Sequence, residues 1–386
     1  MDEIMHKEAD DVFDKSNVGQ KPVVTYVAIL MVVGFFGNIH VLVVFSTQFK
    51  KNSNYVIFVL SLAVIDFLMC SVHMSLEILD LLYPYDFYGS VTCKLFRSNQ
   101  SILTLASIFI LILIAVDRYR HVCHPMRNQW SVSSAKRMIK FCVFLAIIVS
   151  IPVPFLFGLE TVKVSENATK RICFIENELG TEYVLPVVYI LFLNFVFVCG
   201  LVVLLFTYIS IGITTRKRAK VHMMMTSLML PKNRVRLRAS HKKCCCLECF
   251  SCKKLSRVKH HSLKSIGHKR FYQILSRQRT VFGRPTSQDN KKATKVLFCV
   301  TVIFIVSYLP YVTLGLLLTL GHDLQNFLAD PGIVVYRLSV RLLLINHVCN
   351  CFVYGIFDQR FKTACFQFYL NLCSRAKMKL TKGSKR

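Results

Sequence analysis

The segment KLFRSNQSILTLASIFILILIAVDRY, residues 94–119, decides the fold. Between Ser101 and Val116 it has no charged residue, and roughly 20 mostly apolar residues are enough for a helix to cross a bilayer. Stretches of the same kind recur along the chain, so that the predicted spans are 22–45, 55–82, 94–119, 138–159, 183–213, 294–320 and 332–357. The sequence therefore predicts an all-α membrane protein, a seven-transmembrane helix bundle.

Composition and charge agree with this interpretation. Of the 386 residues, 54% are hydrophobic and 18% are charged, whereas soluble domains contain about 45–50% apolar and about 25% charged residues. Because the chain as a whole is apolar, its net charge of +28 indicates basic loops beside membrane spans. No nucleic-acid partner is needed to explain it.

The distribution of charge predicts the orientation. Residues 216–292 contain 22 Lys and Arg, and eight more follow Asp358, whereas five Glu lie between positions 160 and 182. Because basic loops stay on the cytoplasmic side, we expect a plasma-membrane protein whose N-terminus is extracellular and whose C-terminus is cytoplasmic. The predicted regions are an extracellular N-terminus, 1–21, a seven-transmembrane domain, 22–357, which includes the long basic loop 216–292, and a cytoplasmic surface helix and tail, 358–386.

The cysteines fit this orientation. Of the 16 cysteines, only Cys93 and Cys173 fall on the extracellular side, where the environment is oxidising. They are each other's expected disulfide partners, with two free thiols as the alternative. Asn167 begins the sequon Asn167-Ala168-Thr169 in the same loop and is predicted to carry a glycan.

Further cysteines lie on the cytoplasmic side. Cys365 and Cys373, on or after the surface helix, are candidates for lipidation. The cluster at 244–252 could be lipidated, could bind zinc or could remain reduced, and these alternatives stay open.

Asp66 is the clearest ionisable residue inside a predicted span. Such groups are costly in a bilayer, about 2.5–3.5 kcal/mol on insertion scales, and are functional candidates for that reason. The polar residues predicted at similar depth are Asn38, Ser107, Asn346 and Asn350. Carboxylate, amide and hydroxyl oxygens suit a small cation such as sodium, and a hydrogen-bond cluster without an ion is the alternative. No other cofactor is expected.

Five motifs occur in order along the chain, each on a different part of the predicted bundle. They are Gly37-Asn38, Leu62-Ala63-Val64-Ile65-Asp66, Cys93 with Asp117-Arg118-Tyr119, Phe304-Ile305-Val306-Ser307-Tyr308-Leu309-Pro310, and Asn350-Cys351-Phe352-Val353-Tyr354. With these motifs the chain resembles the rhodopsin-like (class A) G-protein-coupled receptors over essentially its whole length. It departs from their pattern at Gly200, Tyr308 and Cys351, where the family has proline, tryptophan and proline.

The resemblance implies a receptor, not an enzyme. Such a receptor binds an extracellular ligand and activates a heterotrimeric G protein when helix six moves outward. The residues implied in G-protein coupling and activation are Asp117, Arg118, Tyr119, Tyr208, Asn350 and Tyr354. The residues implied in transmission along helix six are Phe304, Tyr308 and Pro310. A short amphipathic helix is expected after the seventh span.

The ligand has to be inferred from side chains. The third span has no acidic residue between Arg97 and Asp117, which disfavours an amine ligand, and the seventh has no lysine for retinal. Gln100 occupies the place of the amine receptors' carboxylate, as it does in several neuropeptide receptors, although helix–helix hydrogen bonding would also explain it. We expect Gln100, Tyr308 and Tyr311 to contact the ligand.

The expected partners are a short peptide that is basic or amidated, a heterotrimeric G protein and membrane lipids. A lipid or other small molecule is the alternative ligand. A transporter would need internal repeats or broken helices at the midplane, and the sequence gives no sign of either.

Overall fold

The structure of this chain is a computed structural model, and it describes residues 2–49, 53–83, 89–165, 168–175, 184–229, 286–319 and 330–383. Residues Met1–Ile213 and Lys292–Arg386 form one compact unit, and Thr214–Lys291 form a second. In the described residues, seven helical stretches are long and apolar enough to cross a membrane. The predicted seven-helix fold is therefore confirmed.

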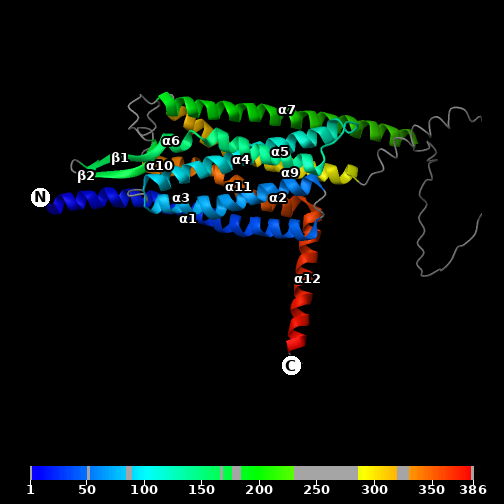
Figure 1. Cartoon of the computed structure of the whole chain (residues 1–386), viewed down its shortest axis with the longest axis horizontal. Coiled ribbons are helices and arrows are strands. Elements are labelled where there is room, and N and C mark those ends of the chain that lie inside the picture. The colour runs from blue at the N-terminus through cyan, green and yellow to red at the C-terminus, as the bar shows by residue number, and fades with distance from the viewer. Residues whose placement is uncertain are drawn as a thin grey trace, which may run out of the picture. The chain divides into compact units, whose positions relative to one another are not determined.

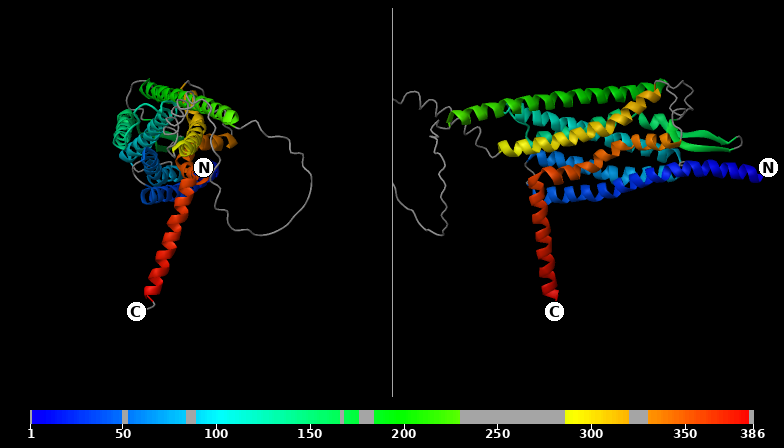
Figure 2. Two further views of the ribbon diagram at one scale, coloured as in Figure 1. Left: turned by 90° about the vertical axis from the view of Figure 1, so that its right-hand side faces the viewer. Right: turned by 180° about the vertical axis from the view of Figure 1, so that it is seen from behind.

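Except for the C-terminal helix, the helices of the first unit lie side by side along most of their length (Figures 1 and 2). In chain order the helical elements are α1 (Asp2–Gln48), α2 (Asn54–Leu68), η1 (Met69–His73), α3 (Met74–Leu82), α4 (Ser90–Cys123), α5 (Val132–Ser150), α6 (Val153–Leu156), α7 (Val184–Met229), α9 (Thr286–Thr319), α10 (Asp330–Ser339), η4 (Leu342–Leu344), α11 (Ile345–Phe357) and α12 (Gln359–Gly383). The second span consists of α2, η1 and α3, the fourth of α5 and α6, and the seventh of α10, η4 and α11.

The fourth span begins earlier than the sequence predicts. It starts at Val132 rather than at 138, because the Ser131 side chain accepts a hydrogen bond from the Ser134 backbone N–H at 3.2 Å and caps the helix. The first turns of this helix contain Lys136 and Arg137, so a search for apolar residues does not include them.

Two spans are irregular near their middle. The second contains the π-helical turn Met69–His73, and the seventh is interrupted by a turn at Val340–Arg341 and by the 3-10 turn Leu342–Leu344. Irregular turns inside helices are frequently found at functional sites. Here they position His73 and Arg341, which belong to the charged cluster described below.

Apolar side chains cover the outside of the bundle as well as its inside. Leu62 and Ile110 are buried, whereas Phe36 and Val306 are 66% and 65% exposed. Helices that are apolar on all sides suit a lipid environment, which agrees with the membrane assignment.

A two-stranded hairpin lies at one end of the bundle (Figure 1). Strands β1 (Phe157–Ser165) and β2 (Ala168–Ile175) pair antiparallel, with Leu159 opposite Cys173. We call this end the disulfide end, and the opposite end of α4 the Arg118 end.

Helix α12 follows the seventh span at the Arg118 end and turns away from the bundle (Figures 1 and 2). Asp358 starts it, because its Oδ1 accepts the Arg360 backbone N–H at 2.9 Å while its Oδ2 accepts the Tyr55 hydroxyl at 2.7 Å. Phe361 then stacks on Phe45, with ring centroids 5.3 Å apart. This helix has 25 residues and is longer than the short helix that the sequence predicts.

Candidate functional site

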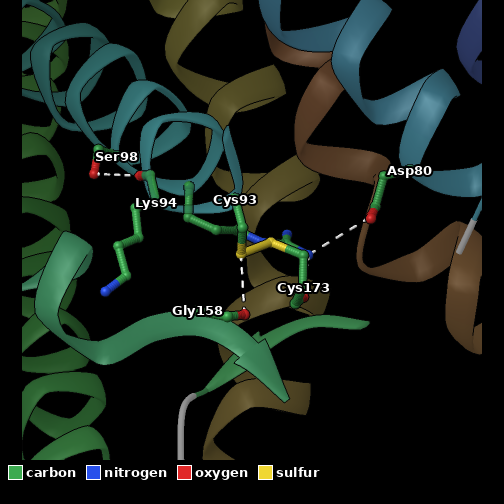
Figure 3. Close-up of a disulfide and its surroundings, with 7 residues drawn as sticks. Asp80, Cys93, Lys94, Ser98, Gly158 and Cys173 are labelled. Carbon is green, nitrogen blue, oxygen red and sulfur yellow. Dashed lines mark hydrogen bonds and ion pairs between the residues drawn. A yellow bond between two sulfur atoms is a disulfide. The ribbon is translucent and has the colours of Figure 1, made fainter. Parts of the chain in front are cut away.

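The disulfide end is held together by Cys93 and Cys173, whose pairing confirms the sequence prediction. The bond joins the first turn of α4 to β2, and the Gly158 carbonyl oxygen of β1 lies 3.2 Å from the Cys93 sulfur (Figure 3). The hairpin is therefore fixed against α4. The predicted glycosylation residue, Asn167, lies outside the described residues.

Beside the disulfide lies a group of charged side chains that we call the ionic cluster, made of His73, Glu77, Asp80, Arg97 and Arg341. Its centre is the pair between Glu77 of α3 and Arg341 of the seventh span. The Glu77 Oε1 atom accepts from Arg341 Nε at 2.8 Å, and a terminal guanidinium nitrogen of Arg341 lies 2.7 Å from the same oxygen. The exposed fractions of these two side chains are 7% and 15%. A hydrogen bond between two charged groups, such as this one, is stronger than a hydrogen bond between neutral groups.

The remaining members surround this pair. His73 Nε2 lies 3.7 Å from Glu77 Oε2, and its ring stacks on Phe96 at a centroid distance of 5.0 Å. Arg97 lies 3.6 Å from Asp80 and donates to the Cys173 carbonyl at 3.3 Å. Figure 3 shows Asp80 pointing toward the disulfide. The cluster thus brings two carboxylates and two guanidinium groups together at the disulfide end.

Sequence reasoning missed the ionic cluster. A signal for it existed, because ionisable residues within spans are functional candidates by default, and His73, Glu77 and Arg341 all lie in predicted spans. The carboxylate of amine receptors is expected on the third span, so Glu77 of the second span is not among the predicted ligand contacts.

Farther along the bundle, Asp66 lies at the centre of a group that we call the polar core, together with Asn38, His347 and Asn350. His347 Nδ1 donates to Asp66 Oδ1 at 2.7 Å, and Asn350 Nδ2 donates to Asp66 Oδ2 at 2.6 Å. Asn38 donates to the His347 backbone carbonyl at 2.9 Å. The structure thus unites Asp66 and Asn350, as the sequence suggested, and adds His347, which sequence reasoning missed.

Ser107 and Asn346 are the other two residues of the predicted polar cluster. Both are completely buried, and within the described chain the Ser107 hydroxyl and both side-chain polar atoms of Asn346 have no hydrogen-bond partner. Sodium binding at these residues stays a prediction at this point.

An aromatic stack leads from the polar core into α9. Phe304 and Tyr308 have ring centroids 4.5 Å apart, and Phe197 of α7 lies 6.5 Å from Tyr308. The Tyr308 hydroxyl is 3.5 Å from His347 Nε2. Of the predicted ligand contacts, Tyr308 is therefore buried against the polar core, whereas Gln100 is half-buried on α4 and Tyr311 is 45% exposed. Pro310 lies inside α9, two residues after Tyr308.

At the Arg118 end, Arg118 pairs with its neighbour Asp117, and both side chains are buried. Asp117 Oδ1 also accepts from Asn54 of α2 at 3.3 Å, and Tyr119 lies 3.1 Å from His124 Nε2. The guanidinium is therefore held by its own helix and, through Asp117, by α2.

The other residues implied in activation surround this end of the bundle. The Tyr208 hydroxyl lies 3.0 Å from Thr301 Oγ1 and links α7 to α9. Tyr354 is buried, packs against Phe45 at 5.9 Å, and in the described chain its hydroxyl has no hydrogen-bond partner.

The two lipidation candidates lie on α12. Cys365 is half-buried and Cys373 is exposed, and burial raises the pKa of the Cys365 thiol. The cluster 244–252 lies outside the described residues, and the described residues contain no group of three or more His, Cys, Asp or Glu that could hold a metal ion.

The family is decided by a match over most of the chain. The family model described as the seven-transmembrane receptors of the rhodopsin family matches residues 37–354. The chain belongs to this family. The match includes all five motifs found in the sequence, from Gly37 to Tyr354.

Several curated receptors are similar to this one. Neuropeptide FF receptor 2 of Rattus norvegicus is 24% identical over 324 residues, which are 82% of this chain and 65% of that receptor. Cephalotocin receptor 2 of Octopus vulgaris is 30% identical over 182 residues, 46% of this chain and 41% of that one. D(2) dopamine receptor A of Xenopus laevis is 29% identical over 222 residues, 55% of this chain and 46% of that one. The chain therefore spans less than two thirds of the length of these relatives.

Proposed function

We propose that this rhodopsin-family receptor lies in the plasma membrane, binds a short basic or amidated peptide at its disulfide end, and activates a heterotrimeric G protein at its Arg118 end. The disulfide end is then extracellular, and the C-terminus is cytoplasmic. The orientation is supported by the basic residues of 216–292 and of the tail. The ligand class is supported by the relatives named neuropeptide FF receptor and by the ionic cluster.

The observation that carries the peptide proposal is the Glu77–Arg341 pair. Both charges are largely removed from solvent, so a ligand that separates them must supply new partners for both, because a buried charge without a partner costs several kcal/mol. A peptide can do so, since a guanidinium or terminal amide donates to Glu77 while a carbonyl oxygen accepts from Arg341. A lipid tail has neither group, and this disfavours the lipid alternative.

Coupling to the G protein follows from the elements that connect the two ends. A ligand changes the receptor only through a different affinity for its two states. We expect contacts with the ionic cluster and with Tyr311 to favour the state in which α9 swings outward about Pro310. Arg118, Tyr208 and Tyr354 then lie at the mouth of the opened surface. Helix α12 lies on the membrane, with Cys365 and Cys373 as lipid attachment sites.

The experiment is a response assay in cells that express the receptor. Calcium and cyclic AMP are recorded while the cells are challenged with a library of amidated peptides, each paired with its free-acid counterpart. We expect a saturable response at nanomolar concentration to an amidated peptide. Glu77→Gln should weaken it by about tenfold to a hundredfold, because hydrogen bonds to charged groups are worth about 1.5–3 kcal/mol.

The control is Asp80→Asn, which changes the neighbouring carboxylate whose contact with Arg97 is longer, at 3.6 Å. We expect the smaller loss from this variant. Silence across the library, with the receptor at the cell surface, would contradict the peptide proposal and favour a lipid or other small-molecule ligand.

A further inference from the structure

We propose that His347 takes the place that the oxygen-rich cluster around Asp66 would otherwise offer to a sodium ion, so that this receptor does not bind sodium there. The imidazole serves Asp66 as a built-in hydrogen-bond donor in place of a cation. This inference concerns the bundle interior and does not depend on which ligand the receptor binds.

The donors around Asp66 carry the argument. One carboxylate oxygen accepts from His347 Nδ1 at 2.7 Å and the other from Asn350 Nδ2 at 2.6 Å. Sodium takes oxygen ligands, whereas a nitrogen donor already approaches each oxygen of the Asp66 carboxylate. Asp66 and His347 are both completely buried, so neither side chain has a face that is open to solvent in this structure. The residues present therefore do not fit the ion.

His347 is also held from other sides. Its backbone carbonyl accepts from Asn38 Nδ2 at 2.9 Å, which ties the seventh span to α1. With a proton on Nδ1, the opposite ring nitrogen is an acceptor, and the Tyr308 hydroxyl lies 3.5 Å from it. One side chain thus connects α2, through Asp66, with the aromatic stack of α9. It is a positioning residue that fixes these spans relative to one another.

Removing the imidazole would leave buried oxygen atoms free to bind an ion. The Ser107 hydroxyl, Asn346 Oδ1 and Asn350 Oδ1 are buried oxygens without a hydrogen-bond partner in the described part of the chain. Together with a released Asp66 carboxylate they would supply the hard oxygen donors that sodium prefers. Replacing His347 by a small residue should therefore create a sodium response that the unmodified receptor lacks.

The test is thermal unfolding of the purified full-length receptor in sodium, potassium or choline chloride at equal ionic strength. An ion that binds only the folded state raises the unfolding midpoint in a saturable manner. We expect the unmodified receptor to unfold at the same midpoint in all three salts. His347→Ser should unfold at a higher midpoint in sodium than in the other two salts, and the double variant Asp66→Asn with His347→Ser should lose this difference.

Two control variants separate ion exclusion from general loosening. Val348→Ala removes buried volume from the same helix without freeing Asp66, and His347→Phe fills the space of the ring without adding an oxygen ligand. Both should unfold at one midpoint in all three salts, as the unmodified receptor does.

Two results would overturn the proposal. One is a sodium-specific, saturable rise of the midpoint in the unmodified receptor that Asp66→Asn abolishes. The other is a folded His347→Ser variant that ignores sodium. If His347→Ser does not fold, the unmodified receptor still decides the question. The unfolding assay contains neither a ligand nor a G protein. Failure of the sodium proposal is therefore distinct from failure of the proposed peptide function.

Discussion

The ionic cluster and the polar core are two buried groups of charged and polar side chains in one bundle, and they differ in kind. In the polar core, Asp66 and His347 are fully buried and every contact of the carboxylate is made within the bundle. In the ionic cluster, Arg341, Asp80 and Arg97 keep side-chain exposures of 15%, 16% and 23%. The closed group is suited to holding helices in register, whereas the partly open group is suited to exchanging partners with a ligand.

The largest loss of stability is expected when only one partner of the Glu77–Arg341 pair is removed. Arg341→Ala leaves Glu77 buried without its partner, and removing one half of a buried pair costs about 3–5 kcal/mol. The unfolding midpoint and the cell-surface level of the receptor should both fall. Replacing the two residues together, as Glu77→Leu with Arg341→Met, should recover most of the loss. A double variant as unstable as Arg341→Ala would show that the pair is not the cause.

Loss of the disulfide is expected to have the second-largest effect on stability. Changing Cys93 and Cys173 together to Ala releases the hairpin from α4, and loss of a native disulfide typically costs about 2–5 kcal/mol. Thermal unfolding of the purified receptor measures this loss. Cys373→Ser, at an exposed and free cysteine, is the matched control and should leave the midpoint unchanged. Equal midpoints for the double variant and the unmodified receptor would refute the role of the disulfide.

The polar core depends on a close approach between α1 and α11. A Cβ atom at Gly37 would lie 2.5 Å from Cys351 Sγ, whereas one at Gly355 would meet nothing within 4 Å. Gly37→Ala should therefore destabilise the receptor by about 1–3 kcal/mol through overpacking, and Gly355→Ala should not. Adding Cys351→Ala to Gly37→Ala should restore part of the stability. No recovery in that double variant would mean that the sulfur is not the obstacle.

The smallest effect is expected where the polar core meets the aromatic stack. Tyr308→Phe removes only the hydroxyl near His347, and a neutral hydrogen bond is worth about 0.5–1.5 kcal/mol. Tyr311→Phe, on the same helix but 45% exposed, serves as the control in the same unfolding measurement. A larger loss of stability from Tyr311→Phe than from Tyr308→Phe would contradict the proposed link.

Much of the fold was predictable because membrane spans are set by apolar length. The seven spans, the Cys93–Cys173 bond and the union of Asp66 with Asn350 follow from span length, redox compartment and shared depth in the membrane. Span ends were less predictable, since the fourth span begins in a polar turn capped by Ser131.

The contacts that the sequence does not predict depend on how the helices are rotated and where they are irregular. His347 lies next to Asn346, yet only the rotation of α11 decides that His347 rather than Asn346 contacts Asp66. Similarly, Arg341 meets Glu77 from a turn that interrupts the seventh span, and no apolar periodicity reveals such a turn. The sequence contains these ionisable residues, but it does not show which residue each of them contacts.

The central claim is that a peptide bound at the disulfide end controls a G protein at the Arg118 end. It is tested most directly by measuring peptide binding and G-protein nucleotide exchange separately for Arg118→Ala and the unmodified receptor, at equal surface expression and with the amidated peptide that activates the latter. We expect Arg118→Ala to bind the peptide with essentially unchanged affinity but no longer to stimulate exchange. Full stimulation by Arg118→Ala would contradict it.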